Sequence, residues 1–212
     1  MKKFLTLSIA ILLIALVHYL DKPYINSTIK PISEINPLIL VNYENKMPEN
    51  ININLVTFQN HKVADIIYND LADMYNQALK ENVTLKINTA YRSKKEQQEI
   101  FNTKQKEYEN NGFSYQTAYD KTRETVSLPG YSEHETGLAI DFSSEGHYDE
   151  NEQMWSWLQT NAYKYGFILR YPKDKYEITK ITYEPWHYRY VGKKDAKEIK
   201  NKNITLEEYV GG

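Results

Sequence analysis

The chain has 212 residues, a formal net charge of -2 and no cysteine. This length fits one folded domain, with or without a terminal tail. The nearly balanced charge gives no general electrostatic reason to bind nucleic acid, so no nucleic-acid partner is expected. The lack of cysteine excludes disulfides, cysteine zinc knuckles, thiol nucleophiles and a lipid anchor on cysteine.

The first residues have the pattern of an export signal. Lys2 and Lys3 precede an apolar run from Phe4 to Leu20, which is close to the length of a membrane span. No small-residue cleavage motif follows this run, so we expect residues 1–21 to be an uncleaved single-pass anchor in the cell membrane. The alternative is a cleaved signal peptide and a secreted protein. Both interpretations place the folded part outside the cytoplasm.

The segment after the anchor has the composition of a linker. Residues 22–37 are polar and are interrupted by Pro23, Pro31 and Pro37. We therefore expect the folded domain to comprise residues 38–212. It opens with the apolar run Leu38–Val41, which is predicted to be a short strand.

A helix and a strand are predicted next. From Asp65 to Asn82, apolar residues recur every three or four positions, which predicts a helix with Asp65 as its N-cap. From Val83 to Ala90, apolar and polar residues alternate, which predicts a strand.

Two further helices are predicted in the middle of the chain. Glu96 follows Ser93 by three residues, and this capping-box pattern predicts a helix that begins at Ser93 and ends near Asn110. A short helix is expected from Tyr115 to Glu124, before the break at residues 128–130.

The second half of the chain mixes strand-like and helix-like patterns. The predicted elements are a strand over 137–142, a helix from Asn151 to Tyr165 ending at Gly166, strands over 167–170, 178–183 and 187–191, and helices over 193–200 and 205–209. Helices mixed with strands that are not adjacent in sequence indicate an α+β fold.

Two dense polar motifs contain His134 and His187, two of the five histidines in the chain. The first motif runs from Ser132 to Asp141, and the second runs from Glu184 to His187. Zinc in a hydrolase typically takes three protein ligands and leaves a fourth position open. Two imidazoles and one carboxylate from these motifs meet that requirement.

The predicted strand over 137–142 offers room for a metal. Gly137, Ala139 and Asp141 share one face of such a strand, while the residues between them face the core. The small side chains beside Asp141 leave space for an ion and a substrate.

The second motif adds a carboxylate beside the expected metal. Pro185 argues against a regular helix, so Glu184 and His187 are expected in a turn that enters a strand. A carboxylate near a metal, but not bound to it, can transfer protons during hydrolysis. Each of these residues taken alone is more typical of a structural role. His147 is a spare candidate ligand that is interpreted as a surface loop residue, and His61 is interpreted as a loop or cap residue.

The chain resembles the VanY-type D-alanyl-D-alanine carboxypeptidases, zinc peptidases that share the hedgehog/D,D-peptidase fold. The resemblance covers about residues 36 to 192. It is carried by Ser132, His134, Gly137, Ala139 and Asp141, then by Glu184 and His187, and upstream by Leu40-Val41-Asn42, Tyr91-Arg92-Ser93 and Glu96-Gln97.

The resemblance implies a role for each matching position. It implies a small antiparallel sheet with flanking helices, Zn²⁺ held by His134, Asp141 and His187, and Glu184 as the catalytic base. Arg92 is expected to hold oxygens of the substrate. Further substrate-binding residues are expected at Gln97, Ser132, Tyr131 and Trp186. Tyr43 departs from the family, which usually has lysine there, so the details of substrate entry are open.

The function implied is removal of the terminal D-alanine from peptidoglycan stem peptides that end in D-Ala-D-Ala. An L,D-carboxypeptidase that acts on tetrapeptide stems is the nearest alternative, followed by a wall endopeptidase. A catalytically inert module that binds the cell wall is the alternative from a different class. The expected partners are stem peptides and, through the anchor, the membrane, and the protein is expected to be a monomer.

Overall fold

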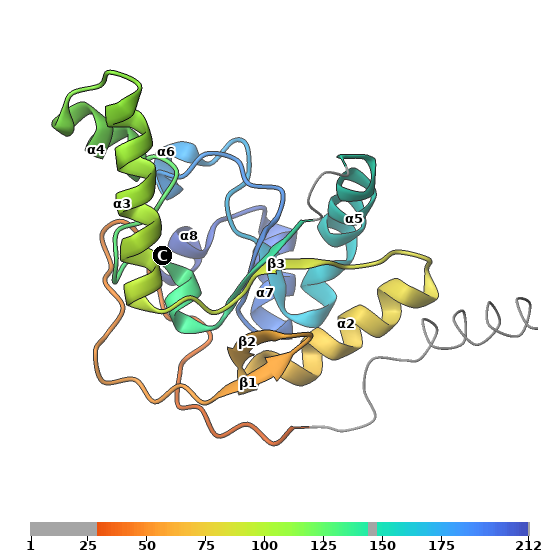
Figure 1. Cartoon of the computed structure of the whole chain (residues 1–212). Coiled ribbons are helices and arrows are strands. Elements are labelled where there is room, and N and C mark those ends of the chain that lie inside the picture. The colour runs from red at the N-terminus through yellow and green to blue at the C-terminus, as the bar shows by residue number, and fades with distance from the viewer. Residues whose placement is uncertain (1–28, 144–147, 212) are drawn as a thin grey trace, which may run out of the picture.

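A computed structural model describes residues 29–143 and 148–211 (Figure 1). The predicted anchor at residues 1–21 and His147 therefore lie outside the described residues. Within the part that is described, no helix is long and apolar enough to cross a membrane. Residues 30–36 contain no helix or strand, but Ile35 is buried and the backbone N–H groups of Ile32 and Ser33 donate to the Asp65 carboxylate.

The elements mix short strands with helices, as expected for an α+β fold. They are β1 (Leu55–Phe58), β2 (His61–Ala64), η1 (Asp65–Ile67), α2 (Tyr68–Lys80), β3 (Ile87–Thr89), α3 (Lys94–Asn110), α4 (Tyr115–Arg123), η2 (Glu133–Thr136), β4 (Ala139–Phe142), α5 (Tyr148–Asn161), η3 (Ala162–Tyr165), β5 (Phe167–Leu169), α6 (Tyr176–Thr179), β6 (His187–Tyr190), α7 (Lys193–Lys202) and α8 (Leu206–Gly211).

The central sheet has four strands in the order β3-β4-β6-β5, and all of its neighbouring strands are antiparallel. Leu138, Ile140 and Phe142 are fully buried and join the core on one face, as the alternation over 137–142 predicts. The fully buried Leu71 and Met74 of α2 pack into the same core. Burying one such side chain stabilises the fold by roughly 1.5–3 kcal/mol, so this face anchors the sheet.

The capping box predicted at Ser93 and Glu96 is confirmed. The Ser93 side chain accepts a hydrogen bond from the backbone N–H of Glu96, and the Glu96 carboxylate accepts one from the N–H of Ser93. Helix α3 begins directly after Ser93 and ends at Asn110. It packs against α4, and the two helices stand together at one end of the molecule (Figure 1).

Two predicted strands are wrong. Residues 178–183 contain the end of α6 and then no regular structure, because Lys180 has a left-handed backbone (φ 55°) that stops the helix. The Thr179 hydroxyl lies within hydrogen-bond distance of the backbone C=O and N–H of Ile181, which favours a local turn over strand pairing. Leu38–Val41 is also not a strand, although Val41 is fully buried.

The start of the predicted helix at Asp65 needs correction. Asp65 opens the 3-10 helix η1, and α2 follows, but neither helix has a side-chain cap. The Asp65 carboxylate instead accepts hydrogen bonds from the segment before β1, including one from the Asn54 side chain at 3.0 Å. The predicted strand over 83–90 is reduced to β3, which comprises three residues.

A hairpin of β1 and β2 was not expected from the sequence. Its turn residues Gln59 and Asn60 both have positive φ, the geometry that joins two antiparallel strands through two residues. The Phe58 ring at the end of β1 packs on Tyr75 of α2 with ring centroids 5.0 Å apart. His61, interpreted as a loop residue, begins β2 instead.

Gly137 is a position where only glycine fits. Its φ is 68°, and a Cβ atom there would lie 2.8 Å from the backbone nitrogen of Ala64, which donates to the Gly137 carbonyl. Gly112 has a φ of 90° with nothing within 4 Å, so it is a matched control for the backbone strain alone. We expect Gly137→Ala to destabilise the fold by about 1–3 kcal/mol more than Gly112→Ala in urea unfolding. Equal losses of unfolding free energy in the two variants would show that the close contact with Ala64 does not destabilise the fold.

Candidate functional site

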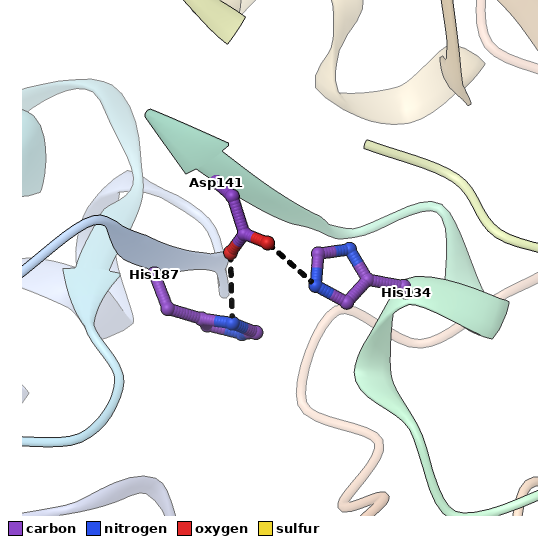
Figure 2. A group of neighbouring side chains, drawn as sticks. All are labelled: His134, Asp141 and His187. Atoms are coloured by element: carbon purple, nitrogen blue, oxygen red, sulfur yellow. Dashed lines mark ion pairs between the residues drawn. The ribbon is translucent and has the colours of Figure 1, made fainter. Parts of the chain in front are cut away.

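The three expected metal ligands meet at the junction of two adjacent strands. Asp141 on β4 lies directly opposite His187 on β6, and His134 comes from the 3-10 helix η2 that precedes β4. One donor atom from each residue lies within 4.8 Å of the others, and the three side chains converge (Figure 2). Ser132 and Gly137 flank η2, and the left-handed backbone of Gly137 turns the chain into β4. The sequence motif thus becomes one compact set of donors.

The contacts of Asp141 fit a metal better than a pair of hydrogen bonds. Its Oδ2 lies 3.3 Å from Nε2 of His134, and its Oδ1 lies 3.1 Å from Nδ1 of His187. Oδ1 is nevertheless buried without a hydrogen-bond partner among the described residues. Donor atoms that approach this closely without hydrogen-bond geometry can direct their lone pairs at a shared ion, as zinc ligands do. The nearby imidazoles hold the pKa of Asp141 far below its usual range, despite burial that acts in the opposite direction.

The orientation of His134 is fixed by the backbone around Arg92. Nδ1 of His134 lies 2.7 Å from the carbonyl oxygen of Ala90, which only accepts, so Nδ1 carries the proton. Nε2 is then free to bind a metal, the arrangement typical of zinc-binding histidines. The backbone N–H of Arg92 donates to the His134 carbonyl at 3.1 Å, which ties the two residues together.

His187 is held from its other side by Glu133. Its Nε2 lies 3.4 Å from Oε2 of Glu133, and the Tyr171 ring lies 4.8 Å from the imidazole between ring centroids. Burial alone would lower the pKa of His187, but contacts with Asp141 and Glu133 outweigh it and raise the pKa to about 10. A metal held at Nδ1 would need this nitrogen unprotonated, so the ring would then be neutral. Glu133 and Tyr171 were not identified from the sequence as site residues.

Glu184 lies beside the three ligands in the predicted turn before β6. Its Oε2 is 3.5 Å from Nδ1 of His187, and 15% of its side chain is exposed. Burial raises the pKa of Glu184 to about 7 in the metal-free molecule. A dication bound next to it would lower that value, because positive charge favours the carboxylate. A group with these properties can exchange protons at neutral pH.

Arg92 and Gln97 form a connected pair at the wall of the site. Nη1 of Arg92 donates to Oε1 of Gln97 at 2.8 Å, and Nε2 of Gln97 donates to the Ser127 carbonyl at 2.7 Å. Gln97 is buried, and burial lowers the pKa of Arg92 from its very high ordinary value without removing its charge. The pair therefore presents a fixed cation to the pocket.

These residues line one pocket of about 260 Å³. Its lining includes Ser132 and Trp186, as expected, together with residues that the sequence did not reveal: Thr125, Val126, Ser127, Tyr171 and Ile181. Tyr131 lies elsewhere: it lines an adjacent cavity of about 360 Å³ together with Tyr43, the residue that departs from the family pattern. Ser127 and Ile181 line both cavities, so the two are neighbours.

Residues 60–193 match the family model VanY, described as D-alanyl-D-alanine carboxypeptidase. A curated relative, the D-alanyl-D-alanine carboxypeptidase of Enterococcus faecalis (strain V583), is 39% identical over 174 residues. The aligned region covers 82% of this chain and 65% of that protein. The chain thus spans slightly less than two thirds of that relative's length.

Two solved structures are similar in fold and in sequence. One is a mutant of the vancomycin resistance D,D-pentapeptidase VanY from a VanB-type cassette, in complex with Zn(II). Its TM-score is 0.77 at 38% identity, with 82% of this chain and 98% of that chain covered. The other is the LdcB LD-carboxypeptidase, with a TM-score of 0.69 at 38% identity and coverage of 81% and 84%.

Proposed function

Because the chain belongs to the VanY family of D-alanyl-D-alanine carboxypeptidases, we propose that it is a zinc-dependent carboxypeptidase. Its proposed substrates are peptidoglycan stem peptides ending in D-Ala-D-Ala, from which it removes the last residue. The observation that carries this proposal is the meeting of three metal ligands, an unbound carboxylate and the half-buried guanidinium of Arg92 in one pocket. The similarity to a D,D-pentapeptidase that binds Zn(II) supports both the metal and the substrate class.

The proposed zinc ligands are Nε2 of His134, a carboxylate oxygen of Asp141 and Nδ1 of His187. Bound zinc supplies Lewis acidity, which polarises a carbonyl and strengthens water as an acid. The chain's part is to hold these atoms in place, with two of them on paired strands and the third clamped by the Ala90 carbonyl.

Glu184 is proposed to move the proton. Its carboxylate lies 3.5 Å from His187, next to the proposed zinc, but it is not one of the three ligands. In its ionised form it takes a proton from the attacking water, and it then passes that proton to the amine of the departing D-alanine. Its burial keeps the carboxylate from bulk water during this exchange.

Arg92 is proposed to stabilise negative charge on the substrate. Its guanidinium is held by Gln97, so it stays in position while the carbonyl oxygen gains charge. We expect Arg92→Gln to lower kcat/KM for a D-Ala-D-Ala peptide by about 10²–10³-fold in steady-state assays. Arg123→Gln removes the same charge from an exposed residue that does not line the metal pocket, and we expect it to leave the rate nearly unchanged. Equal rates in the two variants would remove Arg92 from the mechanism.

L,D-carboxypeptidase activity is the second candidate function. The similarity to LdcB at 38% identity favours it, since the same metal ligands and base could serve either reaction. A wall endopeptidase is less well supported, because the matching family model is that of a carboxypeptidase, whose substrates end in a free carboxylate. An inert binding module would have no need for Glu184 beside the metal.

The masses of the reaction products from two stem peptides distinguish these candidate functions. We expect the zinc-loaded protein to release one alanine from a stem pentapeptide and to leave a tetrapeptide intact. Loss of alanine from the tetrapeptide alone would assign the L,D activity. Cleavage of neither peptide would contradict carboxypeptidase function and favour the endopeptidase or the binding module.

We also propose that residues 1–21 anchor the protein as a monomer at the cell membrane, with the domain outside. The apolar run and its flanking lysines support this placement. Recovery of the full chain in the membrane fraction, with its first residues intact, is the expected result. A shortened chain in the medium would indicate a cleaved signal peptide.

A further inference from the structure

A buried ionic cluster lies behind His187 and takes no part in the chemistry proposed above. Oε1 of Glu133 accepts hydrogen bonds from Nε of Arg170 at 2.7 Å and from Nη1 of Arg189 at 2.8 Å. The side chains of both arginines are fully buried, and that of Glu133 is 1% exposed. Burying an ion cluster this deeply costs desolvation energy, which hydrophobic residues in the same place would not cost. This cost suggests that the cluster has a role beyond stability.

The cluster is fixed at its outer end as well. The remaining guanidinium nitrogens of Arg170 donate to both oxygens of Glu207 on α8, at 2.8 and 2.6 Å. Nη2 of Arg189 donates to the carbonyls of Pro37 and Ile39. Two cations thus face two carboxylates, and Oε1 of Glu133 cannot turn away without breaking its hydrogen bonds to both arginines.

This arrangement leaves one oxygen for His187. Oε2 of Glu133 lies 3.4 Å from Nε2 of His187, and neither atom has a hydrogen bond to any other described residue. On the opposite side of the ring, Nδ1 lies close to the carboxylates of both Asp141 and Glu184. With a metal at Nδ1, the neutral ring must carry its proton on Nε2, and that proton then needs an acceptor.

We propose that Glu133 is a positioning residue, which the two arginines orient so that its free oxygen accepts the Nε2 proton of His187 and directs Nδ1 to the metal. This inference rests on the metal site of the proposed function. The ring is pinned between two carboxylates, and a movement of a few tenths of an ångström brings Nε2 and Oε2 into the usual hydrogen-bond range. The C-terminal helix α8 takes part through Glu207.

Glu133→Gln tests this role with almost no change in shape. The arginines need an acceptor, so the amide oxygen of the glutamine takes the place of Oε1 and its NH₂ group faces His187. The NH₂ group and the Nε2–H of the metal-bound ring are then both hydrogen-bond donors, so the hydrogen bond to His187 is lost. We expect the affinity for Zn²⁺, measured by chelator competition, to fall by about 10–100-fold.

Glu207→Gln is the matched control, because it removes the same charge from the other end of the cluster. We expect it to lower the stability of the fold while leaving the affinity for Zn²⁺ within a few-fold of the wild type. Unchanged affinity in Glu133→Gln, or an equal loss in Glu207→Gln, would overturn the assignment to Glu133.

A measurement on the unaltered chain covers the case in which Glu133→Gln does not fold. In ¹⁵N NMR of the zinc-loaded protein, we expect His187 to bind the metal through Nδ1 and to show an Nε2–H that exchanges slowly with water. Metal on Nε2 of His187 would overturn the proposal. If the wild type binds zinc in this way but does not cleave the pentapeptide, the proposed function fails and the role of Glu133 stands.

Discussion

Replacing Glu184 with glutamine is expected to lower kcat by about 10²–10⁴-fold and to leave the affinity for Zn²⁺ nearly unchanged. The substitution keeps the size of the side chain but removes its ability to take a proton from water. Because Glu184 is not one of the three converging donors, the metal site keeps its ligands. Single-turnover rates on a D-Ala-D-Ala peptide and zinc binding should be measured on the same preparation.

Glu135→Gln is a suitable control for this experiment. Glu135 is a buried carboxylate in the same motif as His134, but its Oε1 accepts from the Gly130 backbone, and it does not line the metal pocket. Glutamine can still accept that hydrogen bond, so we expect turnover close to wild type. Retained turnover in Glu184→Gln would rule out Glu184 as the base. Loss of zinc binding in the same variant would indicate that Glu184 is a metal ligand.

Replacing Asp141 with asparagine is expected to abolish both turnover and specific zinc binding. Asp141 supplies the only negative charge among the three ligands, and its two oxygens face both histidines at 3.1 and 3.3 Å. In asparagine, an NH₂ group takes one of these two positions. Its hydrogens then point at an imidazole nitrogen whose lone pair is needed for the metal. We expect a loss of zinc affinity beyond the 10–100-fold typical of indirect contacts.

Thermal unfolding offers a readout of this loss that is independent of activity. Zinc in excess stabilises the folded wild type in proportion to RT ln(1 + [Zn]/Kd), and that increase in Tm should vanish in Asp141→Asn. Asp70→Asn is the control: Asp70 pairs with Lys193 and Tyr190 away from the site, so zinc should still raise its Tm. A normal zinc-dependent shift in Asp141→Asn would exclude Asp141 as a ligand.

The sequence was informative where short-range pattern determines position. His134 and Asp141 lie in one short motif, and the predicted strand over 137–142 allowed His134 to fold back toward Asp141. The residues after Pro185 had the pattern of a strand, but the choice of His187 as the third ligand was implied by the family resemblance. The Ser93 capping box likewise specified the start of α3, since both of its partners lie within three residues.

The features that the sequence did not reveal depend on distant partners. Glu133 lies 37 residues from Arg170 and 56 from Arg189, and nothing local separates it from a surface glutamate. Tyr131 and Ser132 are adjacent in sequence, yet they line different cavities, although both were expected at one site. The predicted strand at residues 178–183 failed because apolar and β-branched residues also suit a turn with buried side chains, here those of Thr179 and Ile181.

The most direct test is to titrate Zn²⁺ into metal-free protein while measuring release of D-alanine from a pentapeptide. Our account predicts no release without metal, a linear rise, and a plateau at one equivalent per chain, set by the site of His134, Asp141 and His187. Full turnover in the metal-free protein, or zinc binding at that stoichiometry without any release of D-alanine, would contradict it.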